Sequence, residues 1–284
     1  MAERLTKTKI LEILDRHQLG PSRALGQNFL CDGLMIDKIV RLARVKPDDR
    51  VIEIGPGLGS LTLGLLDAGA SVEAIEIDKY LIPALKETVG GHQSDGRIQV
   101  HNCDIRDFDW SPVQSSGVPW SVVANLPYNI ATPLILDLLA ERPELTRFLV
   151  MVQREAGERL VATPGSKIYG IPSVLAGFWA TGRIVGSVKA ELFYPRPKVE
   201  SVLVELQRNA DRPSSDLYPD LQKVVKAGFG QRRKMIRRSL AGILTSEQLE
   251  AAGVVPTMRA EEIELDQWIQ LARQRQSGGS TLEL

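Results

Sequence analysis

The feature that most restricts the possible folds of this chain is a repeated alternation between short β-branched runs and helical stretches. Five runs are expected to form buried strands: Arg50–Ile54, Ser71–Ile77, Arg97–His101, Trp120–Ala124 and Arg147–Val152. Helical patterns separate them, at 60–68, from near Lys79, and at 132–140. This alternation predicts an α/β fold in which helices cover both faces of a parallel sheet. Two later runs, 183–189 and 200–207, are expected to add strands at the edge of the same sheet.

The character of the sequence changes near Arg208. Polar and turn-forming residues fill 209–216, and beyond them the apolar residues repeat with a helical period. Helices are expected at 217–228, 232–241, 246–252 and 261–273. The pattern therefore predicts a first domain over 1–208, a small all-helical domain over 209–276, and a disordered tail over 277–284.

Composition narrows the class of protein. The 284 residues include 35 basic and 35 acidic side chains, which excludes a uniformly basic nucleic-acid coat but not a local basic patch. Cys31 and Cys103 are too few for a disulfide framework or a four-cysteine zinc site. The three histidines have no ligand-like spacing to cysteines or acids, so we expect no metal. No apolar run approaches the ~20 residues of a membrane helix, and the start does not resemble a secretory signal, so we expect a cytoplasmic protein.

A glycine-rich turn joins the first predicted strand to the next helix, with the sequence Glu53-Ile-Gly55-Pro-Gly57 and a third glycine two residues later. Glycines let a backbone approach a ligand closely, but such a turn alone is more often structural. Its position strengthens the prediction, because Glu76 ends the second strand, where a carboxylate can bind ribose hydroxyls, and Asp104 follows the third. Each acid alone would be interpreted as a solvated charge or a helix cap. Together they predict a nucleoside ligand, and the glycine spacing resembles the S-adenosylmethionine loop of class I methyltransferases.

The turn after the fourth predicted strand has the sequence Asn125-Leu126-Pro127-Tyr128. It resembles the Asn/Asp-Pro-Pro-Tyr/Phe motif of enzymes that methylate exocyclic amino groups. An adenine N6 amine is a poor nucleophile because its lone pair is delocalised into the ring. The Asn125 oxygen and a backbone carbonyl of the turn can accept its hydrogens, and Tyr128 can stack on a base taken out of its helix. An isolated match would be an ordinary turn, but its place after the fourth strand predicts catalysis by alignment and electrostatics.

A strongly basic stretch lies within the predicted helical domain. Between Gln222 and Arg238 there are seven basic residues and no acid: Lys223, Lys226, Arg232, Arg233, Lys234, Arg237 and Arg238. A charge run is usually a solvated helix face, but this asymmetry in a neutral chain predicts a surface that contacts RNA phosphates. Lys198 is expected to extend that surface. Charge reversal at Arg232 and Arg233 should weaken RNA binding and leave S-adenosylmethionine affinity intact.

Together these motifs resemble the KsgA/RsmA family of ribosomal RNA adenine dimethyltransferases. The resemblance runs in order along nearly the whole chain, through 26–30, 51–59, 125–130, 153–155, 166–170, 193–199 and 231–240. The family uses S-adenosylmethionine to dimethylate two adjacent adenosines in a hairpin near the 3′ end of 16S rRNA, in a late precursor of the small ribosomal subunit. The resemblance therefore implies a Rossmann-like class I methyltransferase sheet in the first domain and an rRNA-binding role for the helical domain.

The resemblance also implies roles for individual residues. Cofactor contacts are implied for Asn28, Leu30, Glu53, Gly55, Gly57, Glu76, Ile77, Asp104, Ile105 and Asn125. Among these, Asn28 and Leu30 would help to close the site, Glu76 would bind the ribose, and Asp104 would meet the adenine. Catalytic roles are implied for Asn125, Leu126, Pro127, Tyr128 and Phe193, with the two aromatic rings on the two faces of the target base.

Two other functions remain open at this point. The related Erm-type enzymes methylate an adenine of large-subunit rRNA, and the motifs at 166–170, 195–198 and 231–234 favour the small-subunit family over them. Relatives that bind nucleic acid without catalysis share the fold, but the intact glycine loop and Asn-Leu-Pro-Tyr turn argue against lost catalysis. No apolar seam predicts self-association, so we expect a monomer.

Overall fold

The computed structural model describes residues 4–93, 95–211 and 213–279. Its contacts divide the chain into two compact units. Unit 1 contains the residues up to 134 together with 142–157 and 183–207. Unit 2 contains 135–141, 158–182 and the residues from 208 onward.

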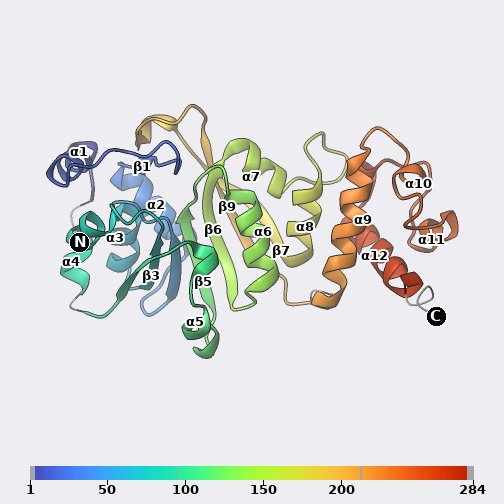
Figure 1. The fold of residues 1–284 in the computed structure, drawn as a ribbon, viewed down its shortest axis with the longest axis horizontal. Helices are drawn as coiled ribbons and strands as arrows, with labels where there is room; N and C mark the ends of the chain where they lie inside the picture. Colours follow the sequence, from blue (N-terminus) through green and yellow to red (C-terminus); the bar gives the residue numbers. More distant parts are fainter. Residues whose placement is uncertain (1–3, 94, 212, 280–284) are drawn as a thin grey trace. The chain divides into compact units, whose positions relative to one another are not determined.

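A seven-stranded sheet carries the fold (Figure 1). Its strands are β2 (Arg50–Ile54), β3 (Ser71–Glu76), β4 (Ile98–Asn102), β5 (Trp120–Asn125), β6 (Leu145–Gln153), β7 (Ala180–Val188) and β9 (Ser201–Arg208). They follow the order β4-β3-β2-β5-β6-β9-β7. Strands β2 to β6 run parallel, which confirms the predicted α/β class.

The last two strands differ in part from the prediction. Strand β7 lies at the edge, as expected, but β9 is inserted between β6 and β7 and runs antiparallel to β6. The burial of the two strands explains the difference. Six successive residues at the start of β9 are buried, whereas the interior of β7 is largely exposed or half-buried. A strand covered on both faces is more stable inside a sheet than at its edge.

A second, two-stranded sheet joins two segments that are far apart in the sequence. Strand β1 (Phe29–Leu30) pairs antiparallel with β8 (Phe193–Tyr194), so that Leu30 lies opposite Phe193. Two residues are too few to show a β period, so sequence pattern predicts neither strand. The pairing anchors the N-terminal segment that forms one wall of a cavity.

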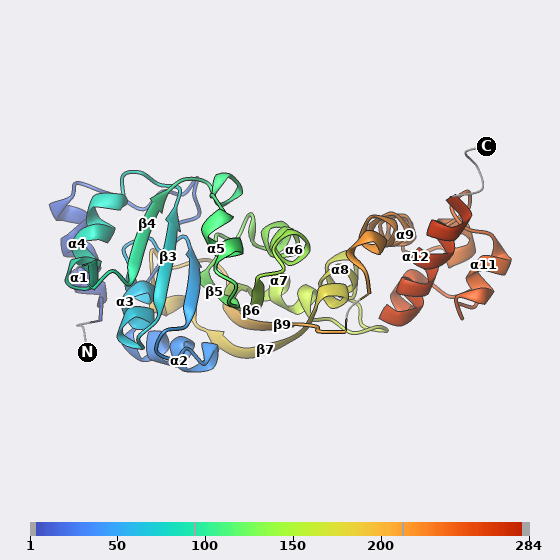
Figure 2. The same ribbon diagram turned by 90° about the horizontal axis from the view of Figure 1, so that it is seen from below.

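Further helices connect and flank these strands. They are α1 (Lys7–Arg16), α2 (Gly33–Ala43), α3 (Ser60–Asp67), α4 (Ile82–Gln93), α5 (Ser111–Ser115), α6 (Ala131–Glu141) and α7 (Arg154–Leu160), with the 3-10 helices η1 (Ile105–Asp107) and η2 (Ala190–Leu192). Helix α3 is buried on almost every side because it packs on both β3 and α2 (Figure 2). A Cβ on Gly64 would lie 2.6 Å from Ile36, so this glycine allows α2 to approach α3 closely.

Unit 2 is built around helices α9 (Tyr218–Gly230) and α12 (Leu265–Gly279), which pack against each other and against α8 (Ile171–Trp179). Trp268 of α12 is fully buried and its ring lies directly against Gly228 of α9. The shorter elements are α10 (Ile236–Ser239), α11 (Ser246–Ala251), η3 (Ser215–Leu217) and η4 (Ala260–Glu262). The unit is larger than the predicted helical domain, because the packing of α8 brings 158–182 into it.

The basic part of unit 2 is less helical than its sequence pattern predicts. A helix is expected over 232–241, but α10 begins only at Ile236 and ends at Ser239. Residues 231–234 instead form a turn in which the Lys234 amide donates to the Gln231 carbonyl. These four residues are polar and exposed, so no buried apolar face stabilises a helix there.

The C-terminal helix extends further than expected. The predicted disordered tail begins at residue 277, whereas α12 continues to Gly279. An ion pair between Arg275 and Asp220 ties the last turns of α12 to α9. Residues 280–284 of the predicted tail lie outside the described residues.

Two features are absent from residues 4–93, 95–211 and 213–279. None of the helices there is long and apolar enough to cross a bilayer. The same ranges hold no group of three or more His, Cys, Asp or Glu side chains placed to bind a metal ion.

Candidate active site

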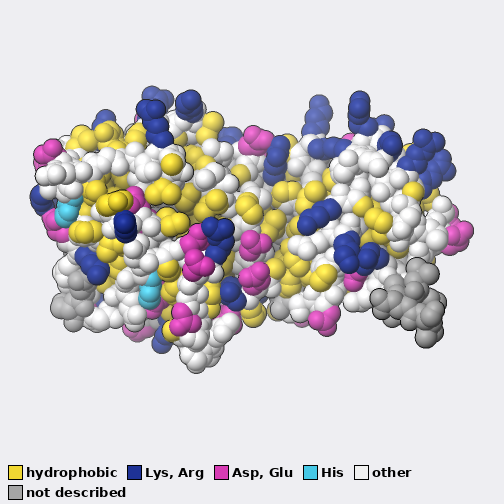
Figure 3. Space-filling model, viewed as in Figure 1, with side chains coloured by type: hydrophobic (Ala, Val, Ile, Leu, Met, Phe, Trp, Pro, Cys, Tyr) yellow, Lys and Arg dark blue, Asp and Glu magenta, His cyan; other side chains and the backbone are white. Residues whose placement is uncertain are grey.

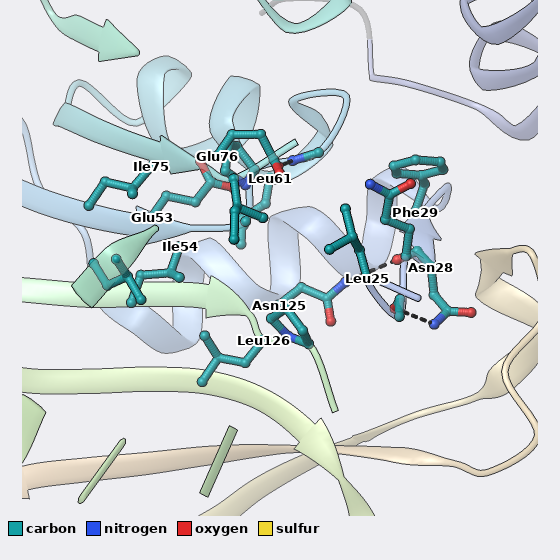
Figure 4. A pocket seen from close by; sticks show the side chains of 18 of the residues that line it. Leu25, Asn28, Phe29, Glu53, Ile54, Leu61, Ile75, Glu76, Asn125 and Leu126 are labelled. Carbon is teal, nitrogen blue, oxygen red and sulfur yellow. Dashed lines mark hydrogen bonds between the residues drawn. The ribbon is translucent and has the colours of Figure 1, made fainter. Parts of the chain in front are cut away.

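A cavity lies at the carboxyl ends of β2, β3 and β5, where ligands bind in open α/β sheets. It opens to solvent, and the space within it and at its mouth together is about 1010 Å³. The residues predicted to contact the cofactor all line it: Asn28, Leu30, Glu53, Gly55, Gly57, Glu76, Ile77, Asp104, Ile105 and Asn125. Figure 4 shows Glu53 and Glu76 on one side, the segment with Asn28 and Phe29 on the other, and Asn125 between them.

The glycine turn after β2 forms the floor of this cavity. Gly55 and Gly57 have φ angles of 70° and 60°, in the left-handed region that favours glycine. A Cβ on Gly57 would lie 3.1 Å from the ring of Phe29. Glycine is therefore needed at position 57 for two reasons: the backbone conformation of the turn and the close approach of the N-terminal segment.

Two buried carboxyl groups lie beside the turn. Glu76 accepts hydrogen bonds from the amides of Gly57 at 3.0 Å and Asp78 at 2.9 Å. Burial nevertheless raises the pKa of Glu76. Burial also raises the pKa of Glu53 to about 8, and the nearby Glu76 carboxylate adds to this shift. The Oε2 atom of Glu53 has no hydrogen-bond partner among the described residues, so the cavity holds a buried acceptor that a cationic or donating ligand group would satisfy.

Asp104 lies just before η1 and is held by a neighbour in sequence. Its Oδ1 accepts from the backbone amide of Arg106 at 3.0 Å and from the Arg106 Nε at 3.0 Å. These hydrogen bonds lower the pKa of Asp104. The carboxylate is therefore ionised at neutral pH and able to accept from an amino group. Two apolar residues also line the cavity: Ile77, which follows β3, and Ile105, which follows Asp104.

The N-terminal segment is tied to the cavity at two points. Asn125 Nδ2 donates to the Asn28 carbonyl at 3.1 Å. Gln27 Nε2 donates to Asp78 Oδ2 at 2.7 Å, beside the ribose-binding candidate Glu76. Sequence reasoning missed Gln27 and Asp78 as a pair, because they are 51 residues apart.

The turn after β5 supplies the residues predicted to act on the target amine. Asn125, Leu126, Pro127 and Tyr128 all line the cavity. Phe193, the fifth predicted catalytic residue, does not. Its side chain is 3% exposed and belongs to the apolar core, because the β1–β8 pairing sets it against Leu30. The structure thus places one of the two predicted base-stacking rings at the cavity and buries the other.

Seven of the eight basic residues predicted to bind RNA are exposed in unit 2, on α9, α10 and the turn between them. Figure 3 shows Lys and Arg side chains gathered over α9 and α10. Six of them form what we call the cationic face: Lys223, Lys226, Arg233, Lys234, Arg237 and Arg238. The seventh, Arg232, pairs with Glu261 at 2.7 Å and donates to the Lys167 carbonyl at 2.5 Å, so it also ties a loop to η4. Lys198 is exposed on unit 1, where it lines a shallow cleft with Arg196.

Comparison with known proteins identifies this arrangement. A family model described as ribosomal RNA adenine dimethylase matches residues 21–276. The chain belongs to this family. Proteins named ribosomal RNA small subunit methyltransferase A are close relatives: that of Leifsonia xyli is 42% identical and covers 94% of this chain and 97% of its own length. That of Nocardia farcinica is also 42% identical, over 95% of each chain.

Solved structures of the rRNA dimethylase family and its neighbours share the fold. The 23S rRNA methyltransferase ErmE is 27% identical, with a TM-score of 0.68 over 87% of this chain and 99% of its own. A dimethyladenosine transferase from Plasmodium falciparum is 24% identical, with a TM-score of 0.71 over 88% of this chain and 98% of its own. These likenesses confirm the predicted class I methyltransferase fold.

The cavity fits the S-adenosylmethionine that this family uses. The Glu76 carboxylate keeps lone pairs free for ribose hydroxyls, and ionised Asp104 can accept from the adenine amine. The positive end of the cofactor suits the unpartnered Glu53 oxygen, because a nearby cation favours the ionised carboxylate. The order β4-β3-β2-β5 sets these groups along one edge, from Asp104 through Glu76 and the glycine turn to Asn125.

Proposed function

We propose that the protein dimethylates the N6 amines of two adjacent adenosines in a hairpin near the 3′ end of 16S rRNA. Its substrate would be a precursor of the small ribosomal subunit, and its role would be in the assembly of that subunit. It would act in the cytoplasm as a monomer. The names of the relatives support the subunit, since small-subunit enzymes are 40–42% identical to this chain, while the large-subunit enzyme ErmE is 27% identical.

The orientation of the Asn125 amide carries the proposal. Its Nδ2 is engaged by the Asn28 carbonyl, so its Oδ1 is left as an acceptor, and Figure 4 shows that oxygen turned away from Asn28. An acceptor fixed in this way can take a hydrogen bond from an adenine N6 amine. A carbonyl of the Leu126–Pro127 turn can take the second one.

These two acceptors explain how a poor nucleophile can react. Hydrogen bonds to both N6 hydrogens favour a pyramidal nitrogen with a lone pair available for methyl transfer, and the proton that N6 then loses passes to solvent. The bound cofactor supplies a methyl group on a sulfonium centre. The protein supplies alignment, because Glu76 and Asp104 hold the nucleoside end while the turn holds the amine. Tyr128 stacks on the flipped base, which must leave its helix to reach the cavity.

Methyl transfer to defined ribosomal substrates tests the proposal. Labelled S-adenosylmethionine would be incubated with undermethylated small subunits, with large subunits and with free rRNA, and the modified nucleosides would be identified. We expect N6,N6-dimethyladenosine on small subunits and a fall in rate of about 100-fold or more for Asn125→Ala.

The other functions predict different results. Dimethyladenosine formed only on large-subunit RNA would assign the protein to the Erm type. RNA binding without any modification would indicate a relative that has lost catalysis. Either result would overturn the proposed function.

A further inference from the structure

Ser201 contacts the hydroxyl of Tyr128, the aromatic residue of the turn after β5. Its Oγ is 2.7 Å from the phenol oxygen of Tyr128, and the two hydroxyls share a hydrogen bond. We propose that Ser201 is a positioning residue for methyl transfer, which fixes the ring plane of Tyr128 before the adenine arrives. The inference rests on the proposed function, in which Tyr128 stacks on that adenine.

The direction of β9 brings Ser201 to this place. Ser201 is the first residue of β9 and pairs with Gln153, the last residue of β6. Because β9 runs antiparallel to β6, its first residue lies at the carboxyl edge of the parallel strands. Tyr128 follows β5 at the same edge. A parallel strand at this position would place its first residue at the opposite edge, away from the cavity.

The burial of Ser201 makes its hydrogen bond to Tyr128 necessary. Ser201 is fully buried, and the three residues that follow it in β9, Val202, Leu203 and Val204, are buried and apolar. Tyr128 is half-buried and lines the cavity. A buried hydroxyl needs a partner, so the two groups are held together. The ring of Tyr128 is then held at its far end by Ser201 and at its near end by the turn that begins with Pro127.

A ring fixed at both ends does not have to be ordered when the base binds. Preorganised groups bind better because they lose less conformational freedom. A phenylalanine would offer the same stacking face without this second attachment. The value of the tyrosine hydroxyl here is therefore its bond to Ser201.

The hydroxyl is not suited to accept the proton that leaves the amine. Burial raises the pKa of Tyr128, and the hydrogen bond with Ser201 offsets this only in part. The phenol therefore stays protonated at neutral pH and acts by orientation rather than by proton transfer.

A double-mutant cycle tests this role. Ser201→Ala, Tyr128→Phe and the double variant would be assayed on undermethylated small subunits, with kcat and KM measured separately and S-adenosylmethionine affinity measured by calorimetry. Each single change should lower kcat by about fivefold, with cofactor affinity unchanged. The double variant should be no slower than either single one, because both remove the same bond.

Ser173→Ala is the matched control. Ser173 is another buried serine, and its hydroxyl donates to the Arg159 carbonyl at 2.6 Å within unit 2. It should lower thermal stability and leave kcat unchanged. This separates a general cost of losing a buried serine from a specific effect on methyl transfer.

Several outcomes would overturn the inference. Full kcat in Ser201→Ala, or losses that multiply in the double variant, would show that Ser201 does not act through the phenol. If Ser201→Ala fails to fold, Tyr128→Phe with Ser201 intact decides the question, since unchanged kcat there also excludes the role. Failure of the proposed function is distinguishable, because the wild-type protein would then leave small subunits unmodified.

Discussion

The cofactor cavity and the cationic face use polar groups in opposite ways. In the cavity, Glu53 and Glu76 are 1% and 4% exposed, burial raises the pKa of both, and backbone amides donate to Glu76. On the cationic face every charged side chain is exposed to solvent. A buried polar group is costly unless its surroundings match it, whereas exposed charges are screened and act together. Single changes in the cavity should therefore have large, specific effects, and single changes on the face small, additive ones.

The glycine turn should give the largest effect. Gly57→Val places a side chain against Phe29 and strains the backbone at positive φ, so the free energy of unfolding should fall by about 3 kcal/mol. S-adenosylmethionine binding should be lost in calorimetric titrations. Gly117→Val is the control, since Gly117 also has positive φ but faces open space. Equal loss of cofactor affinity in both variants would contradict a specific role for the turn.

The buried Glu53 should make stability depend on pH. Its pKa is raised from 4.5 to about 8, so the folded protein binds a proton that the unfolded chain has already released above pH 4.5. Stability should therefore fall as pH rises from 4.5 toward 8, by about 2 kcal/mol between pH ~6 and ~7.5.

Thermal melting of the wild type and of Glu53→Gln across this range measures the effect. The glutamine cannot ionise, so this part of the pH dependence should disappear. A wild-type slope that persists in the variant would assign it to other groups.

Changes on the cationic face should alter the salt dependence of rRNA binding. Replacing Arg237 and Arg238 by alanine should weaken rRNA binding about tenfold and reduce the slope of log affinity against log salt by about 1.5. Cofactor affinity should stay unchanged, because both residues lie in unit 2 and the cavity lies in unit 1. Filter binding at several salt concentrations makes the measurement. An unchanged slope would show that these residues do not contact phosphates.

The smallest effects are expected at two neighbouring arginines, Arg232 and Arg233, whose roles should differ. Arg232 is paired with Glu261 and the Lys167 carbonyl, whereas Arg233 belongs to the cationic face. Arg232→Ala should lower stability by about 0.5 kcal/mol, a small value because the pair is partly exposed. Arg233→Ala should leave stability unchanged and weaken rRNA binding more than Arg232→Ala does. The reverse ranking in RNA binding would show that phosphates displace Glu261 from Arg232.

Much of the cavity could be predicted because its residues follow strand ends that are visible in the sequence. Glu53, Glu76, Asp104 and Asn125 each come directly at or after an apolar run, and parallel strands bring their carboxyl ends to one edge. The cationic stretch could also be predicted, since its charged residues are close together in the sequence. The helix expected over 232–241 was predicted too long, because residues 231–234 have no apolar face to bury.

The parallel sheet, the glycine turn and the polar residues at successive strand ends could be predicted from the sequence, because each depends on a short-range pattern. The folded structure was needed to show the order of the strands with β9 inserted, the burial of Phe193 and the contacts Gln27–Asp78 and Tyr128–Ser201. These features join residues that are distant in the chain. No local period or spacing encodes such contacts, since they arise when packing brings separate strands and loops together.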